Sequence, residues 1–244
     1  MTRVPTSPTS PTSPTSPRSP TSNDPFGVLR RVMQPRERPR PGEVCEMCAE
    51  PVSDLHSHVA SLSERRILCT CRSCYLLFTA QGAGARRLRA VPERVKQASD
   101  FSFSQAQWDD LAIPVDLVFL FRQSDLTDTD APARVVACYP SPAGATESEL
   151  DLAAWTEMTA DNPTLADVET DVEAVLVRRH GDGEFICLVV PIDACYELVG
   201  LVKQYWSGFQ GGDQVWQHID GFFDRLRERA AGNRRRHPSG RAAT

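Results

Sequence analysis

Five cysteines and two histidines fall between residues 45 and 74, and this cluster limits the possible folds more than any other segment. Two Cys-x-x-Cys pairs, Cys45/Cys48 and Cys71/Cys74, are separated by 22 residues. This spacing is typical of a zinc ribbon, in which each pair sits on a tight turn and four thiolates surround one ion. We therefore predict a Zn²⁺ site formed by these four cysteines. Four thiolates also suit a rubredoxin-like iron or an iron–sulfur cluster, so iron is the alternative.

Three further residues with ligand chemistry lie between the two pairs. Cys69 is one thiol more than a closed tetrahedral site needs, so it either replaces Cys71 or lies outside the coordination sphere. His56 and His58 would share one face if their segment is extended. With Cys69 they would make a second site of three ligands with an open position. The alternative is that both histidines lie on the surface or donate hydrogen bonds to the thiolates.

Composition divides the 244 residues into four segments. Residues 1–42 begin with Pro-Thr-Ser triplets and continue as a basic, proline-broken linker, and we predict that they are disordered. Residues 43–96 form the predicted metal module, and 97–231 an acidic α+β domain. Residues 232–244, which include three consecutive arginines, are predicted to be a disordered basic tail.

Charge and hydropathy exclude several classes of function. Residues 97–223 hold 22 acidic and 5 basic side chains, a balance that repels phosphate backbones and argues against nucleic acid as the main ligand. No apolar run reaches the ~18 residues of a membrane-spanning helix. The N-terminal run is too polar for a signal peptide, so the eight cysteines predict a reducing cytoplasm. Cys138, Cys187 and Cys195 lie in apolar stretches and are expected to be small buried side chains.

After a short helix around Trp108, the acidic segment contains two similar blocks, each reading strand, turn, strand, proline and helix. The strands are expected at Val115–Phe121 and Arg134–Pro140 in the first block, and at Val172–Val177 and Phe185–Val190 in the second. Helices holding Trp155 and Trp206 follow, and a last helix starts at Gly211. The pattern predicts an α+β fold with a mostly antiparallel sheet, helices on one face and a possible ββα duplication.

Local signals refine the helix starts and suggest one ligand loop. Thr146–Glu149 matches a capping box, and Asp193 is a plausible N-cap. Between Tyr139 and Thr146 the chain is rich in small residues, and such a loop before a helix can bind an anion on its backbone amides. Its candidate ligand residues are Ser141, Gly144 and Thr146. The loop lacks the lysine and glycine spacing of a P-loop, so a rigid turn is the alternative.

The acidic segment contains no recognisable catalytic arrangement. Asp171, Glu173 and Asp193 stand near apolar strands, but no base or nucleophile accompanies them in the sequence. The spacing supports neither a Ser–His–Asp triad nor a Cys–His pair. We therefore predict a protein without enzymatic activity of its own.

Six segments resemble an uncharacterised actinobacterial family whose genes lie among those of uptake [NiFe]-hydrogenases. The segments are Cys45–Cys48, His56–His58, Leu68–Phe78, Tyr139–Ser148, Asp171–Val177 and Pro191–Leu201. The likeness extends from about Cys45 to Leu226 and leaves out both ends of the chain. It implies a cytoplasmic accessory role in hydrogenase assembly, metal delivery or electron transfer.

Residues and resemblance together give three hypotheses. The first is a non-enzymatic zinc-ribbon accessory protein that contacts a hydrogenase subunit or a maturation factor. The second is a redox carrier that holds iron at the same thiolates. The third is a metalloenzyme that uses the open site of His56, His58 and Cys69.

Overall fold

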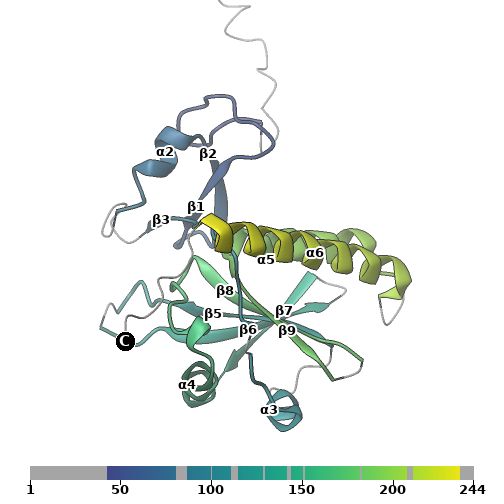
Figure 1. The fold of residues 1–244 in the computed structure, drawn as a ribbon. Helices are drawn as coiled ribbons and strands as arrows, with labels where there is room; N and C mark the ends of the chain where they lie inside the picture. The colour runs from purple at the N-terminus through teal and green to yellow at the C-terminus, as the bar shows by residue number, and fades with distance from the viewer. Residues whose placement is uncertain are drawn as a thin grey trace, which may run out of the picture. The chain divides into compact units, whose positions relative to one another are not determined.

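A computed structural model describes residues 43–80, 87–99, 101–110, 115–128, 130–141, 144–150, 152–181, 183–207 and 211–236. The predicted disorder of residues 1–42 lies outside this part of the chain, as does that of 237–244. Within it, two antiparallel sheets and a few helices form an α+β fold, which confirms the predicted class (Figure 1). No helix in the described ranges combines the length and the apolar character needed to cross a membrane.

The metal module is built on a three-stranded sheet of order β2-β1-β3. Its strands are β1 (Ser57–Ser61), β2 (Arg66–Thr70) and β3 (Leu88–Ala90). Strand β1 is central because it pairs antiparallel with both neighbours. After β2 the chain forms helix α2 (Arg72–Leu76) and does not continue as a strand. Tyr75 instead packs from this helix turn onto Val59 and Leu68, the small core of the module.

The larger sheet has six strands in the order β4-β9-β8-β5-β6-β7, and every neighbouring pair is antiparallel. Val, Ile, Leu and Phe dominate the central strands, as expected where both faces are covered. The strands are β4 (Lys96–Gln97), β5 (Leu117–Gln123), β6 (Arg134–Ser141), β7 (Gly144–Leu150), β8 (Glu173–Arg179) and β9 (Phe185–Pro191).

Helices cover both faces of this sheet, so the prediction that they lie on one face is wrong. Strand β8 shows why, because Ala174 and Leu176 point into one apolar cluster while Val175 and Val177 point into another. Helices α5 (Ile192–Tyr205) and α6 (Gly212–Arg236) pack into the first cluster. Helices α3 (Gln105–Asp110) and α4 (Leu152–Asp161) pack into the second, on the opposite face (Figure 1).

The predicted ββα duplication is not the arrangement found. Thr146–Glu149, which matched a capping box, belongs to strand β7, and β7 pairs along its whole length with β6. The first block therefore has three strands before its helix and the second has two. Helices α4 and α5, the supposed counterparts, also lie on opposite faces. The last helix begins as predicted but continues past Ala231 to Arg236. Residues 232–236 therefore belong to this helix and not to the predicted tail.

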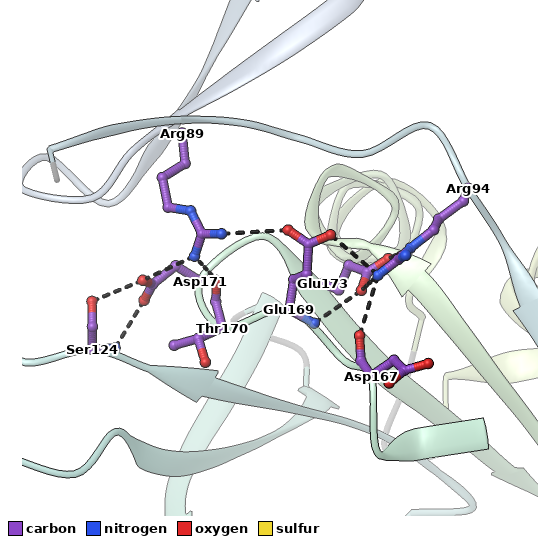
Figure 2. Close-up of polar contacts among 8 residues, drawn as sticks. All are labelled: Arg89, Arg94, Ser124, Asp167, Glu169, Thr170, Asp171 and Glu173. Carbon is purple, nitrogen blue, oxygen red and sulfur yellow. Dashed lines mark hydrogen bonds and ion pairs between the residues drawn. The ribbon is translucent and has the colours of Figure 1, made fainter. Parts of the chain in front are cut away.

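Side chains of the metal module reach acidic groups of the sheet domain (Figure 2). The guanidinium of Arg94 donates to both carboxylate oxygens of Glu173, at 2.6 and 2.7 Å, and the Glu173 side chain is fully buried. Arg89 donates to the carbonyl oxygen of Thr170. Nearby, Asp171 accepts from both the backbone and the hydroxyl of Ser124, each at 2.8 Å. The contacts of Arg89 and Arg94 thus join the module to the start of β8 and to the residues just before it.

Candidate metal centre

The first cysteine pair sits on a tight turn. Val44 and Pro51 form an isolated antiparallel bridge that closes the segment. Inside it, the amide of Cys45 donates to the carbonyl of Glu50 at 2.7 Å, and the amide of Ala49 donates to the carbonyl of Cys45 at 2.8 Å. Ala49 takes a positive φ of 60° to complete the turn. The turn buries Cys45 and leaves Cys48 exposed.

The second pair sits at the start of helix α2. Cys71 is the N-cap residue, with extended backbone, and Cys74 lies one turn later within the helix. The amide of Tyr75 donates to the carbonyl of Cys71 at 3.0 Å, which fixes the turn. Residues three apart on a helical turn project to the same side, so the two sulfurs can face one ion.

The structure brings the four predicted ligands together, because their sulfur atoms all lie within 4.8 Å of one another. The Sγ atoms of Cys48 and Cys71 are 3.7 Å apart. A tetrahedral ion with Zn–S bonds of about 2.3 Å would place its sulfurs ~3.8 Å apart. Cys69 is not part of this group, so it does not replace Cys71. The donor set and spacing fit a tetrahedral metal ion.

Local electrostatics favour a cation among the four sulfurs. Burial opposes ionisation of Cys45, but backbone amides of Cys71, Cys48 and Met47 donate to its sulfur and lower its pKa to about 6. The pKa of Cys74 rises to about 12, mainly through its hydrogen bond with Cys48 and through burial. The Cys45 thiolate thus forms readily, whereas the pKa values of Cys48 and Cys74 are raised, so these two thiols resist ionisation. A bound cation removes this conflict by stabilising all four thiolates.

The three further candidates form a second group on the module. His58 and Cys69 are direct cross-strand partners on β1 and β2, and His56 lies two residues before His58. One ligand atom from each of the three lies within 4.8 Å of the others. The two imidazole rings are 4.7 Å apart between centroids. The expectation that both rings share one face is therefore confirmed.

Sequence reasoning missed the partner of this second group. Asp193 was expected to cap helix α5, but Pro191 is the N-cap residue and Asp193 lies in the first turn. Its carboxylate instead contacts Nδ1 of His58 at 2.7 Å. No local signal could reveal this contact, because 135 residues separate the two side chains.

The predicted ligand loop has a different local structure from the one expected. Ser141 ends strand β6 and Gly144 begins β7, where the two residues pair across a hairpin, and Thr146 pairs with Tyr139. No helix starts there, so the proposed helix-terminal anion site lacks its basis. A cavity of about 630 Å³ lies nearby, and its lining includes the neighbouring Ala145 and Glu147 but none of these three residues.

The remaining cysteines behave as core residues. Cys138, Cys187 and Cys195 are buried, as predicted. Burial raises the pKa of Cys138 to about 12 and also raises the pKa of the other two thiols. All eight cysteines lie in the described part of the chain, and none of them forms a disulfide. None of the three belongs to either ligand group, and their raised pKa values disfavour the reactive thiolate form.

Comparison with known proteins gives one match. The profile of a family of unknown function, DUF5947, matches residues 44–230, a span that includes both ligand groups and both sheets. No curated protein and no protein of solved structure matches the chain.

Proposed function

This chain belongs to the family of unknown function DUF5947, and we propose from its metal centre that it is a non-enzymatic, metal-binding accessory protein. The convergence of four sulfurs within 4.8 Å carries this proposal. In it, Zn²⁺ bound by Cys45, Cys48, Cys71 and Cys74 maintains the fold of the module, and the protein acts through contacts with a partner. Zinc is the preferred ion because a closed tetrathiolate without open positions is the usual structural zinc site.

A structural role for the ion follows from the small size of the module core. Among the described residues of the module, Val59, Leu68 and Tyr75 form its own buried cluster, with partly buried side chains such as Met47 and Phe78 packed against it. A segment of this size cannot offset its conformational entropy by apolar burial alone, and metal binding commonly supplies the difference. The ion joins the first turn to helix α2, which β1 and β2 separate along the chain.

The proposed partner is a [NiFe]-hydrogenase subunit or maturation factor in the cytoplasm, as the sequence resemblance implies. The module offers apolar contact area for such a partner. Leu55 is 93 % exposed, and Leu76 and Leu77 beside the second cysteine pair are also exposed. Leu76 and Leu77 are adjacent in the sequence, and neighbouring exposed apolar side chains commonly mark protein contacts.

Metal analysis of the full chain tests the metal half of this proposal. Protein purified under anaerobic, reducing conditions should contain zinc, and Cys71→Ser should lose the ion bound by the four thiolates. Cys187→Ala is the matched control, since it removes a buried thiol that is far from the ligands in sequence and should leave the metal content unchanged. Full zinc content in Cys71→Ser would refute the assignment.

Affinity capture from the native host tests the partner half. The tagged full chain should recover a hydrogenase subunit or maturation factor, and a variant with Leu76→Glu and Leu77→Glu should recover less of it. Both leucines are exposed, so these changes should leave the fold intact. Recovery of no hydrogenase-related protein by the native chain would reject this partner.

A thiolate-iron redox carrier is the second candidate, favoured by the exposure of Cys48. A ligand that reaches the surface shortens the path for an electron from a partner to the ion. The visible spectrum separates the two candidates, because thiolate-bound iron is coloured and zinc is not. A colourless, zinc-loaded protein would reject the carrier.

A further inference from the structure

We propose that His56, His58 and Cys69 form a second metal site that binds a divalent transition ion and keeps one coordination position for an outside ligand. This inference goes beyond the structural zinc centre, since it uses none of the four ligands of that centre. Imidazole and thiolate donors together suit borderline ions such as Zn²⁺, and Co²⁺ can serve as its coloured substitute.

The β-sheet of the module places the three donors. His58 on β1 and Cys69 on β2 are directly opposite in an antiparallel register, so their side chains project from the same face. Alternation along the chain adds His56 to that face. Ala60 and Ile67, the next pair on the same face, pack into the core of the sheet domain. The donors therefore lie beside a packed interface, which restricts their movement.

Hydrogen bonding sets the tautomer of His56 for metal binding. Its Nδ1 is 2.8 Å from the carbonyl oxygen of Ser53. A carbonyl oxygen can only accept, so Nδ1 carries the hydrogen and the neutral ring has its lone pair on Nε2. This Nε2 atom is buried, and no described residue forms a hydrogen bond with it. Burial without a partner is unfavourable for a polar atom, and a metal ion would satisfy it.

The contact with Asp193 prepares His58 in the same way. The carboxylate accepts from Nδ1 at 2.7 Å, which leaves Nε2 as the ligand atom. A carboxylate that orients a histidine and increases its basicity is a common partner of metal-bound imidazole. Asp193 lies in the first turn of α5, where the helix dipole stabilises its negative charge. A residue of the sheet domain thus positions a ligand of the module.

The number of ligands distinguishes this site from the zinc centre. Among the described residues, no fourth cysteine, histidine or carboxylate joins the three. Three protein ligands with an open position is the arrangement of exchangeable or catalytic ions, whereas four thiolates close the coordination sphere. The open position would accept water or a donor group from a partner.

The test is a Co²⁺ titration of the full chain after one equivalent of Zn²⁺ has filled the tetrathiolate centre under reducing conditions. We expect one further equivalent of Co²⁺ to bind, with a thiolate-to-cobalt charge-transfer band from Cys69. His56→Ala should weaken this binding at least ~100-fold, and Cys69→Ser should remove the band. Asp193→Asn, a change in a positioning residue, should weaken binding about 10- to 100-fold.

Controls separate this proposal from the zinc centre and from loss of folding. His218→Ala removes an imidazole stacked on Tyr205 and should bind Co²⁺ like the native chain. In His56→Ala, an unchanged zinc content would show that the module is still folded. The proposal is overturned if no Co²⁺ binds beyond the tetrathiolate, or if His56→Ala binds the second ion as tightly as the native chain. Failure of the tetrathiolate to hold zinc would instead contradict the proposed function.

Discussion

In the metal module, a cluster of three buried side chains forms the apolar core, whereas the sheet domain buries a large cluster on each face of six strands. The sheet domain can therefore fold through apolar burial, which contributes about 25 cal/mol per Å². The module depends more on ligand bonds and on contacts with its neighbour, both polar and apolar, since Ala60, Val91 and Val95 of the module are buried in the first cluster of the sheet domain. The difference indicates that the two regions should respond very differently to metal removal and to loss of single charges.

The largest expected effect is loss of the zinc centre by Cys71→Ser or by a strong chelator. Zinc sites of this type contribute on the order of 10 kcal/mol to folding, so the module should unfold. The sheet domain should remain folded because its clusters contain none of the four ligands. Hydrogen exchange read by mass spectrometry should show lost protection in β1 and β2 and retained protection in β5 and β8.

The same experiment can disprove the expected difference between the metal module and the sheet domain. If β5 and β8 lose protection together with β1 and β2, the two regions fold as one cooperative unit and the distinction drawn above is wrong. Native-like protection of β1 and β2 after complete metal removal would show that the interface alone holds the module. Cys187→Ala with zinc bound serves as the matched cysteine control.

The second expected effect comes from Arg94→Met, which removes the partner of the buried Glu173. Breaking a buried ion pair from one side costs about 3–5 kcal/mol, and the lower end applies because Arg94 is partly exposed. Urea unfolding followed by tryptophan fluorescence should measure the loss. Arg72→Met is the matched control, since its pair with Glu93 is exposed on both sides and should contribute at most ~1 kcal/mol. Equal effects of the two variants would refute a special role for Glu173.

This interface shows where sequence reasoning ends. The sequence indicated Asp171, Glu173 and Asp193 as acidic residues near apolar strands but gave them no partners. In the structure, Asp171 contacts Ser124 and Arg89. Glu173 pairs with Arg94, and Asp193 pairs with His58. The metal module supplies Arg89, Arg94 and His58. Long-range pairing depends on how the two sheets meet, and no local pattern in a single sequence encodes that.

The grouping of the cysteines and histidines in space was predictable from the sequence, because ligand chemistry requires a fixed local spacing. The Cys-x-x-Cys turns and the alternation of His56 and His58 depend only on neighbouring backbone geometry. Thr146–Glu149 failed as a helix start for the opposite reason. Its capping pattern is compatible with a helix, but pairing with Tyr139 through Val136 on β6 satisfies the same amides in a strand.

A smaller effect is expected from Glu46→Gln at the edge of the zinc centre. Burial opposes ionisation of Glu46, but hydrogen bonds from Arg66 and from the amide of Cys69 lower its pKa below the usual value. A carboxylate with a lowered pKa adds stability above its unfolded pKa and loses it as pH falls through the folded value. At neutral pH the variant should lose about 1 kcal/mol.

The measurement for Glu46→Gln is the difference in unfolding free energy between native chain and variant across an acid titration. The difference should be constant near neutrality and shrink towards zero at acid pH, since protonation makes the native glutamic acid resemble the amide. A difference that grows on acidification would have the wrong sign and would exclude this electrostatic account. Glu50→Gln, an exposed neighbour of the same turn, is the control and should change little.

The smallest effect is a stabilisation, expected for Ala49→Gly in the first cysteine turn. A non-glycine residue at a φ of 60° carries strain of about 1–2 kcal/mol, which glycine removes. Glycine also adds freedom to the unfolded chain, which offsets about 0.4–1 kcal/mol of that gain. The net gain of about 0.5–1 kcal/mol should appear as slower zinc transfer to a chelator.

The same substitution in the other region should have the opposite sign. Ala106 is an exposed residue of helix α3, where glycine relieves no strain and lowers helix stability by about 0.5–1 kcal/mol. Ala106→Gly should therefore weaken the sheet domain and leave zinc transfer unchanged. If both variants destabilise, the positive φ of Ala49 stores no strain. If Ala49→Gly alone slows zinc release, the geometry of the first cysteine turn limits how tightly the module holds its ion. Removal of one methyl group would then stabilise the metal module and destabilise the sheet domain.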